Sequence, residues 1–329
     1  MSDFKRRSIP PGWGAFGLIT ITCLLGTVAG IFNRTSWIGE LSIHFRVQYV
    51  LWLTIAAIVC VWRHRRAAAA LCAASSLINV LFLIPFFYAP HFAQPPASAV
   101  TLKVVSLNVH LANTHFDRVA NFLNATGADI IVLEEVDARW LDELRPRLKA
   151  YKEEISEARY DCFGMALFCR IPLIDRQIIE LVDPGIPTVQ ARLMLDGRPL
   201  TLYGMHPPPP MSPAHARARN RQLQALARRL ILSGGPAVVV GDLNMTSWSP
   251  FFSDFLKDTN LLDTRIGRGV QGSWPSPLPI FLNIPIDHAL VSKDFVVRRR
   301  LLGPHVGSDH RPVILEISWA GTERPKLKP

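Results

Sequence analysis

Five short polar segments, each placed after an apolar run, constrain the fold of this chain more than any other feature. Each puts Asp, Glu, Asn or His where a strand-like stretch of Val, Ile and Leu stops. Buried strands that end in such side chains build an oxygen-rich pocket, which hard cations such as Mg²⁺ or Mn²⁺ prefer. A site that neutralises a phosphate and activates a water needs such a pocket. The segments are residues 104–108, 130–135, 238–244, 285–288 and 307–310.

Taken together, the segments resemble the endonuclease/exonuclease/phosphatase superfamily, over roughly residues 100–318. The match consists of the opening Asn108, Leu-x-Glu, Gly-Asp-x-Asn, Ile-Asp-His and Ser-Asp-His, in the family's order. The resemblance implies an α/β fold, a four-layer sandwich of two mixed β-sheets flanked by helices. It also implies a phosphoesterase that depends on Mg²⁺ or Mn²⁺.

The resemblance assigns the metal ligands. Glu135 is expected to be the main ligand, with Asn108 and Asp309 beside the same ion. Glu134 stands where relatives usually have Gln. Because side chains alternate faces along a strand, only one of the two glutamates is expected to point into the pocket.

Four further residues are expected to carry the chemistry. His310 is expected to be the general base or the group that orients the attacking water, because a histidine pKa lies near neutrality. Asp287 would orient its ring. Asp242 and Asn244 are two residues apart, so they share a face if the strand continues. They would then hold the nucleophile, a phosphate oxygen or a second ion.

His206 is assigned to phosphate binding or to protonating the leaving oxygen. In deoxyribonuclease-like members a Glu near this point partners the histidine, but here the stretch reads Phe163-Gly164-Met165. Trp274 is expected to wall the substrate pocket, and plain packing is an equal alternative. His288, next to Asp287, is expected to be structural.

The N-terminus carries three long runs without charge, at 8–33, 47–62 and 67–87. A helix needs about 20 apolar residues to cross a bilayer. The runs predict three transmembrane helices at about 12–32, 46–63 and 67–88. A signal peptide is the alternative for the first run, and buried soluble helices are an alternative for all three.

Charge placement predicts the topology of this anchor. Of the formal net charge of +10, residues 1–98 hold +6 and residues 99–329 hold +4, so the basic balance is weak evidence for nucleic-acid binding. Lys5-Arg6-Arg7 precedes the first run, and Arg63, Arg65 and Arg66 follow the second. The positive-inside rule places both clusters in the cytoplasm. Three crossings then put the C-terminal domain outside the cytoplasm, at a bacterial-type plasma (inner) membrane.

Two domains follow: an anchor with a Pro-rich linker at 1–98, and a catalytic domain at 99–329. Apolar periodicity also predicts individual elements. The expected helices are 116–126, 138–148 and one from Ser212-Pro213 to Gly234-Gly235, and the expected strands include 101–108, 129–135, 237–240, 286–292, 295–301 and 312–318.

The expected function is hydrolysis of phosphate esters, nuclease-like, by a membrane-tethered domain. The expected partners are the lipid bilayer and a phosphate-ester substrate, a nucleic acid or a lipid head group, with no protein partner. One alternative is a lipid head-group phosphodiesterase or phosphatase. Another is a non-catalytic binding module, which has no physical need for so many clustered carboxylates.

Overall fold

The computed structural model describes residues 13–88, 99–182 and 185–321. The chain divides into two compact units, Met1–Ile84 and Pro85–Pro329. Residues 89–98 of the predicted linker, and residues 183–184, lie outside the described part of the chain.

The N-terminal part of the chain is helical. Its elements are α1 (Trp13–Ala29), η1 (Gly30–Phe32), α2 (Trp37–Ile43), α3 (Arg46–Trp62) and α4 (Arg66–Phe87). Two helices, Gly14–Phe32 and Arg66–Phe87, are long and apolar enough to cross a membrane. The second predicted span coincides with α3, which is bent by 70° from α2. The bent pair adds a third candidate only if it forms one span.

Polar side chains join helices within the first unit. The Asn79 amide of α4 donates to Thr27 Oγ1 of α1 at 2.9 Å, and Arg46 of α3 donates to Asn79 Oδ1 at 3.0 Å. Interhelical hydrogen bonds of this kind hold helices together where the surroundings are apolar.

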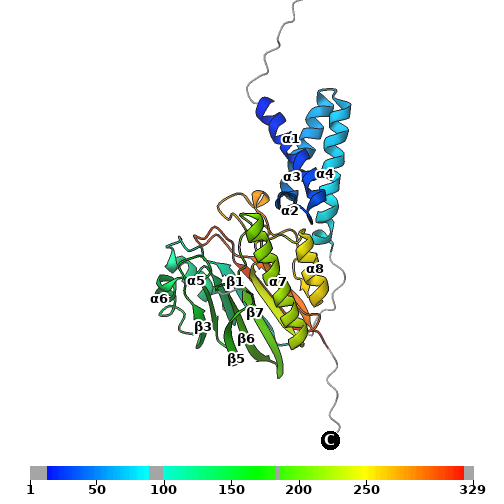
Figure 1. Cartoon of the computed structure of the whole chain (residues 1–329). Helices are drawn as coiled ribbons and strands as arrows, with labels where there is room; N and C mark the ends of the chain where they lie inside the picture. The colour runs from blue at the N-terminus through cyan, green and yellow to red at the C-terminus, as the bar shows by residue number, and fades with distance from the viewer. Residues whose placement is uncertain (1–12, 89–98, 183–184, 322–329) are drawn as a thin grey trace, which may run out of the picture. The chain divides into compact units, whose positions relative to one another are not determined.

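The second unit contains two six-stranded sheets, both mixed (Figure 1). The first has the order β11-β12-β1-β2-β4-β3 and the second β5-β6-β7-β8-β10-β9. The pairs β1–β2 and β7–β8 are parallel, and the remaining neighbours are antiparallel. The strands are β1 (Leu102–Asn108), β2 (Ile130–Glu134), β3 (Glu153–Glu157), β4 (Met165–Cys169), β5 (Leu173–Glu180), β6 (Pro187–Leu195), β7 (Arg198–Met205), β8 (Ala237–Asp242), β9 (Leu262–Asp263), β10 (Asp287–Val291), β11 (Phe295–Leu302) and β12 (Val313–Trp319).

Alternation along the strands divides the core into layers. In β2, Ile130 and Val132 belong to the cluster shared by both sheets, whereas Ile131 and Leu133 belong to the cluster under α5 and α6. A third cluster joins the second sheet to α7 and α8. Figure 1 shows α5 and α6 on one side of the sheets and α7 and α8 on the other. The helices are α5 (Phe116–Thr126), α6 (Ala138–Leu144), α7 (Pro213–Ser233), α8 (Pro250–Thr259) and η2 (Ile280–Leu282). The predicted sandwich of two mixed sheets flanked by helices is confirmed.

Local signals explain most helix ends. Ser212 Oγ accepts from the His215 amide at the start of α7, and Gly127 ends α5 with a φ of 60°. One predicted boundary is wrong. The helix expected to reach residue 148 ends at Leu144, and Pro146, which has no N–H to donate, lies two residues later.

Candidate active site

Both sheets deliver polar strand ends to one region of the second unit. In the first sheet, Asn108 at the end of β1 lies opposite Glu134 at the end of β2. In the second, Asp242 of β8 lies opposite Asp287 of β10. Asn108 Nδ2 lies 3.4 Å from Asp242 Oδ2. This contact joins the two sheets at the candidate site.

A glycine lets β7 and β8 approach closely here. Gly241 has a φ of 140°, and a Cβ at this position would collide with the carbonyl oxygen of Met205. The approach places His206, the residue after β7, beside Asp242, with Nε2 of the histidine 3.5 Å from Oδ2. Close packing of β8 against Met205 therefore explains why a glycine precedes Asp242.

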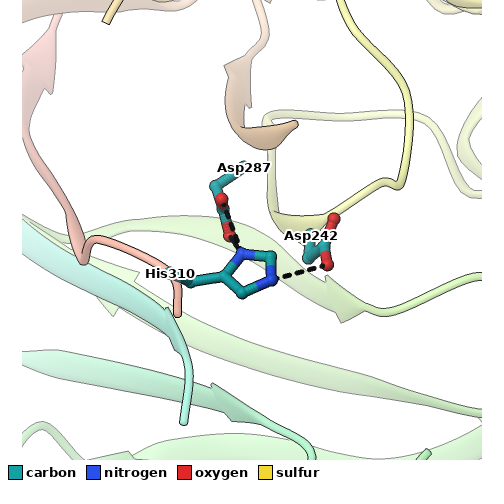
Figure 2. A group of neighbouring side chains, drawn as sticks. All are labelled: Asp242, Asp287 and His310. Carbon is teal, nitrogen blue, oxygen red and sulfur yellow. Dashed lines mark hydrogen bonds and ion pairs between the residues drawn. The ribbon is translucent and has the colours of Figure 1, made fainter. Parts of the chain in front are cut away.

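His310 lies between two carboxylates (Figure 2). Its Nδ1 contacts Asp287 Oδ2 at 2.9 Å and Oδ1 at 3.1 Å. On the other side of the ring, Nε2 lies 3.6 Å from Asp242 Oδ2. All three side chains are buried. The structure thus brings together three of the predicted catalytic residues from β8, β10 and the segment before β12.

Burial and charge oppose each other at this cluster. Burial alone would lower the pKa of His310, but the charges of Asp287 and Asp242 outweigh it and raise the pKa to about 10. Burial would raise the pKa of Asp242, but His310 and His206 lower it. The arrangement favours an ionised Asp242 beside a protonated His310.

His206 is buried and held by a backbone group. Its Nδ1 donates to the carbonyl oxygen of Cys162 at 3.1 Å, so the other nitrogen faces Asp242. Burial opposes protonation, but contact with Asp242 raises the pKa of His206 above its ordinary value. In this chain, which has no Glu at Phe163-Gly164-Met165 to partner His206, the carbonyl oxygen of Cys162 is the hydrogen-bond partner of Nδ1.

Glu135 turns toward Asn108 just after β2 ends. It has a φ of 60°, which interrupts strand alternation. Its Oε1 accepts from Asn108 Nδ2 at 2.9 Å, and its Oε2 accepts from the Leu111 amide at 3.0 Å. Two of the three predicted metal ligands therefore lie in direct contact.

Asp309, the third predicted ligand, is bound by groups that the sequence did not reveal. Its Oδ2 accepts from the Trp274 indole N–H at 3.0 Å, and its Oδ1 lies 3.5 Å from His110 Nδ1. Trp274, predicted to wall the substrate pocket, therefore also holds a carboxylate of the candidate site.

Asn244 does not continue the strand. β8 ends at Asp242, and Asn244 has a φ of 52°. Its amide N–H donates to Asp242 Oδ1 at 2.8 Å, while its side chain donates to the Pro207 carbonyl at 3.0 Å. Asp242 and Asn244 are joined through a turn, and the shared strand face does not form.

Glu134 is a site residue that strand alternation did not identify. It is fully buried on the inter-sheet face, where its Oε1 accepts from Ser106 Oγ at 2.9 Å. Its Oε2 has no hydrogen-bond partner among the described residues. Burial first, and then the charge of Asp287, raises the pKa of Glu134 to about 8. The signal in the sequence is a carboxylate that directly follows a fully apolar strand.

The donor set fits a hard divalent cation. Asn108, Glu135 and Asp309 offer only amide and carboxylate oxygens, the ligands that Mg²⁺ and Mn²⁺ prefer. Glu134 adds a further buried carboxyl group to this region, with one oxygen that has no hydrogen-bond partner among the described residues. Next to this set, Asp242, Asp287 and His310 bring ligand-type atoms within 4.8 Å of one another.

His288 points away from this cluster. Its Nε2 donates to the Met245 carbonyl at 2.7 Å, and its Nδ1 accepts from Arg265 at 2.8 Å. Burial first, and then Arg265, lowers the pKa of His288 to about 3. These contacts match the expected structural role. The two cysteines of this unit, exposed Cys162 and buried Cys169, are free thiols.

A family model described as the endonuclease/exonuclease/phosphatase family matches residues 105–310, more than half of the chain. No curated protein matches the sequence.

Solved structures share the fold at low identity. A humanised D. rerio TDP2 carrying 14 mutations has a TM-score of 0.54 and 14% identity, covering 66% of this chain and 99% of that chain. A mannosyl-6-phosphatase of Bacteroides thetaiotaomicron has a TM-score of 0.55 and 19% identity, covering 66% and 100%. A Beutenbergia cavernae family member has a TM-score of 0.56 and 18% identity, covering 68% and 72%.

Proposed function

The chain belongs to the endonuclease/exonuclease/phosphatase family, and we propose that it is a membrane-tethered phosphodiesterase that depends on a divalent cation. One observation carries this proposal. His206 and His310 present their Nε2 atoms to the same oxygen of Asp242, at 3.5 and 3.6 Å, beside the Asn108–Glu135 pair. Two basic groups next to a carboxylate-rich edge can hold a phosphate and handle protons.

Glu135, Asn108 and Asp309 would hold the cation. When bound, a divalent ion supplies positive charge that stabilises the negative charge developing on the phosphoryl group. Trp274 and His110 keep the Asp309 carboxylate in position through the contacts at 3.0 and 3.5 Å.

His310 and Asp287 would manage the proton of the attacking water. Asp287 binds Nδ1, which leaves Nε2 directed at the reacting region. A histidine oriented in this way can take a proton at Nε2 or return it, which is the task of a general acid or base.

Asp242 and His206 would act on the phosphate from the second sheet. The raised pKa of His206 favours its imidazolium form, which can bind a phosphate oxygen or protonate the leaving oxygen. Asn244, whose amide binds Asp242, would keep that carboxylate aligned and add a polar contact to the phosphate.

The chemistry at phosphorus suits both a nucleic-acid diester and a lipid head group. Solved structures that share the fold also differ in what their titles name: one is TDP2 with a single-strand DNA product, and another is a mannosyl-6-phosphatase. The protein would lie in a bacterial-type plasma membrane with the catalytic unit outside the cytoplasm, if the bent pair α2–α3 adds a third span to the two apolar helices and the flanking arginines stay in the cytoplasm.

The test measures whether the purified full chain hydrolyses bis(p-nitrophenyl) phosphate in the presence of Mg²⁺, of Mn²⁺ or of a chelator. We expect turnover with either metal and none with the chelator. His310→Ala should remove turnover, whereas Glu180→Ala, an exposed carboxylate on β5, serves as the matched control. Turnover that persists equally with chelator, or equally in His310→Ala, would contradict the proposal.

A further inference from the structure

An exposed apolar loop, residues 275–283, lies between Trp274 and Ile284. Among the described residues of 99–321, eleven large apolar side chains are exposed, and four of them fall within this one loop. They are Leu278, Ile280, Phe281 and Leu282, with exposed fractions of 45%, 58%, 53% and 40%. No charged residue occurs from Gly272 to Ile286. Such a concentration marks an interaction surface.

The loop is closed at its base and stiff. Trp274 and Ile284 form an antiparallel bridge, and the Ile284 amide donates to the Trp274 carbonyl at 2.6 Å. The Leu282 amide donates to Pro279 at 2.8 Å, and Asn283 is buried below it. Prolines at 275, 277 and 279 restrict the backbone further. The apolar tip is therefore held outward.

Both arms of the loop are fixed to the candidate active site. On the first arm, Trp274 binds Asp309 Oδ2, and the Ser276 amide donates to the Asp309 carbonyl at 2.7 Å. On the second arm, the chain enters Asp287, whose amide donates to Ser273 Oγ at 3.2 Å. The loop thus connects an expected metal ligand to the residue that orients His310.

Two other loops next to site residues carry an exposed apolar side chain. Tyr160 is two residues before Cys162, whose carbonyl binds His206. Met211 is five residues after His206. Their exposed fractions are 72% and 75%. Six of the eleven exposed apolar side chains of residues 99–321 thus lie in the loop 275–283 or within five residues of Cys162 or His206.

We propose that the loop 275–283 inserts into a lipid surface and that the site hydrolyses a phosphate ester of a lipid held in that surface. The inference rests on the proposed function. The loop carries no charge, so it can enter a bilayer interface without desolvating an ion. The chain also has two helices apolar enough to hold it at a membrane, which makes a bilayer the occupant that this surface fits.

A fluorescence experiment tests insertion without requiring activity. The full chain carrying Phe281→Cys, in a Cys162→Ser background, is labelled with an environment-sensitive dye and reconstituted into phosphatidylcholine–phosphatidylglycerol vesicles. Leu232→Cys, exposed at the end of α7, is the matched control. We expect blue-shifted emission, quenched by nitroxide lipids, at position 281 and not at 232. Equal emission at the two positions would overturn the proposal, and so would a blue shift without lipid quenching, which would indicate burial of the loop against a second copy of the chain.

A second experiment tests the substrate. The vesicle-bound full chain is assayed on phospholipid, on soluble bis(p-nitrophenyl) phosphate and on plasmid DNA. In the triple variant Ile280→Ser/Phe281→Ser/Leu282→Ser, we expect the ratio of lipid to soluble-ester hydrolysis to fall roughly tenfold or more. The pair Ile231→Ser/Leu232→Ser should leave the ratio unchanged. An unchanged ratio in the triple variant, or cleavage of DNA without cleavage of lipid, would refute the inference. Failure to hydrolyse even the soluble ester would refute the proposed function itself, and the labelling result would still decide insertion.

Discussion

Nδ1 of His310 lies 2.9 Å from Oδ2 of Asp287, and both side chains are buried. The carboxylate sets the ring orientation, so that Nε2 faces Asp242 at 3.6 Å. In the proposed mechanism, Asp287 would therefore act through His310 and not at the reacting atoms themselves.

This pair should behave as a unit. His310→Ala and Asp287→Asn are each expected to lower kcat/KM by roughly 100-fold or more. The double variant should lose no more than His310→Ala alone, to within about threefold, because one residue acts through the other. Losses that multiply in the double variant would show two independent roles.

Asp287→Asn should also move a limb of the pH–rate profile. The Asp287 charge is a main cause of the raised pKa of His310, so its removal lowers that pKa. The limb that reports His310 is expected to shift to lower pH. A shift of the acidic limb identifies His310 as a base, and a shift of the basic limb identifies it as an acid.

Glu135→Ala should abolish hydrolysis and weaken Mn²⁺ binding measured by calorimetry. It removes one charge from a carboxylate-rich edge, so the thermal midpoint in chelator is expected to stay equal or rise slightly. Glu180→Ala is the matched control. Activity within about threefold of the parent would reject Glu135 as a ligand.

Glu134→Gln should stabilise the protein in chelator. The pKa of Glu134 is raised from 4.5 to about 8, so the unfolded state loses this proton first as pH rises. The contribution of the protonated Glu134 carboxyl to the free energy of unfolding is fully present below about pH 4.5 and declines as pH approaches 8. Glutamine can still accept from Ser106 without that penalty. We expect the free energy of unfolding of Glu134→Gln to exceed that of the parent by an amount that grows between these pH values, to roughly 1–3 kcal/mol. A constant difference would contradict the burial of an ionisable group.

His288→Ala should destabilise the second unit by roughly 1–3 kcal/mol, because it orphans the Met245 carbonyl and removes one of the acceptors of Arg265. The pKa of His288 is lowered from 6.5 to about 3. The contribution of the neutral His288 ring to the free energy of unfolding is therefore complete above about pH 6.5 and is lost as pH falls toward 3. The difference in thermal midpoint between parent and variant should narrow over that range. His215→Ala, an exposed histidine on α7, is the control and should show neither effect.

The catalytic unit should face away from the cytoplasm. The prediction depends on three crossings and on the cytoplasmic placement of Lys5-Arg6-Arg7 and of Arg63, Arg65 and Arg66. An export-dependent phosphatase fused after Pro329 is expected to be active. If the bent pair α2–α3 does not span, two crossings remain. A silent phosphatase and a fluorescent cytoplasm-dependent fusion at the same position would establish the opposite topology.

The sequence by itself determined the sandwich class, the family and the strand ends that form the site. Short continuous apolar runs mark β1 and β2, whose residues are buried on both faces of the sheet. The Ser212-Pro213 start and the Gly127 end of helices are equally local signals.

Only the tertiary structure decided how these ends meet. Strand alternation stops where β2 and β8 end, so it could not place Glu135 or Asn244, which both adopt positive φ. The supports of the site join distant segments: Cys162 holds His206 across 44 residues, and Trp274 holds Asp309 across 35. Periodicity reports the face on which a side chain lies within one element. The pairing of two such faces depends on how the whole chain packs, which no local pattern encodes.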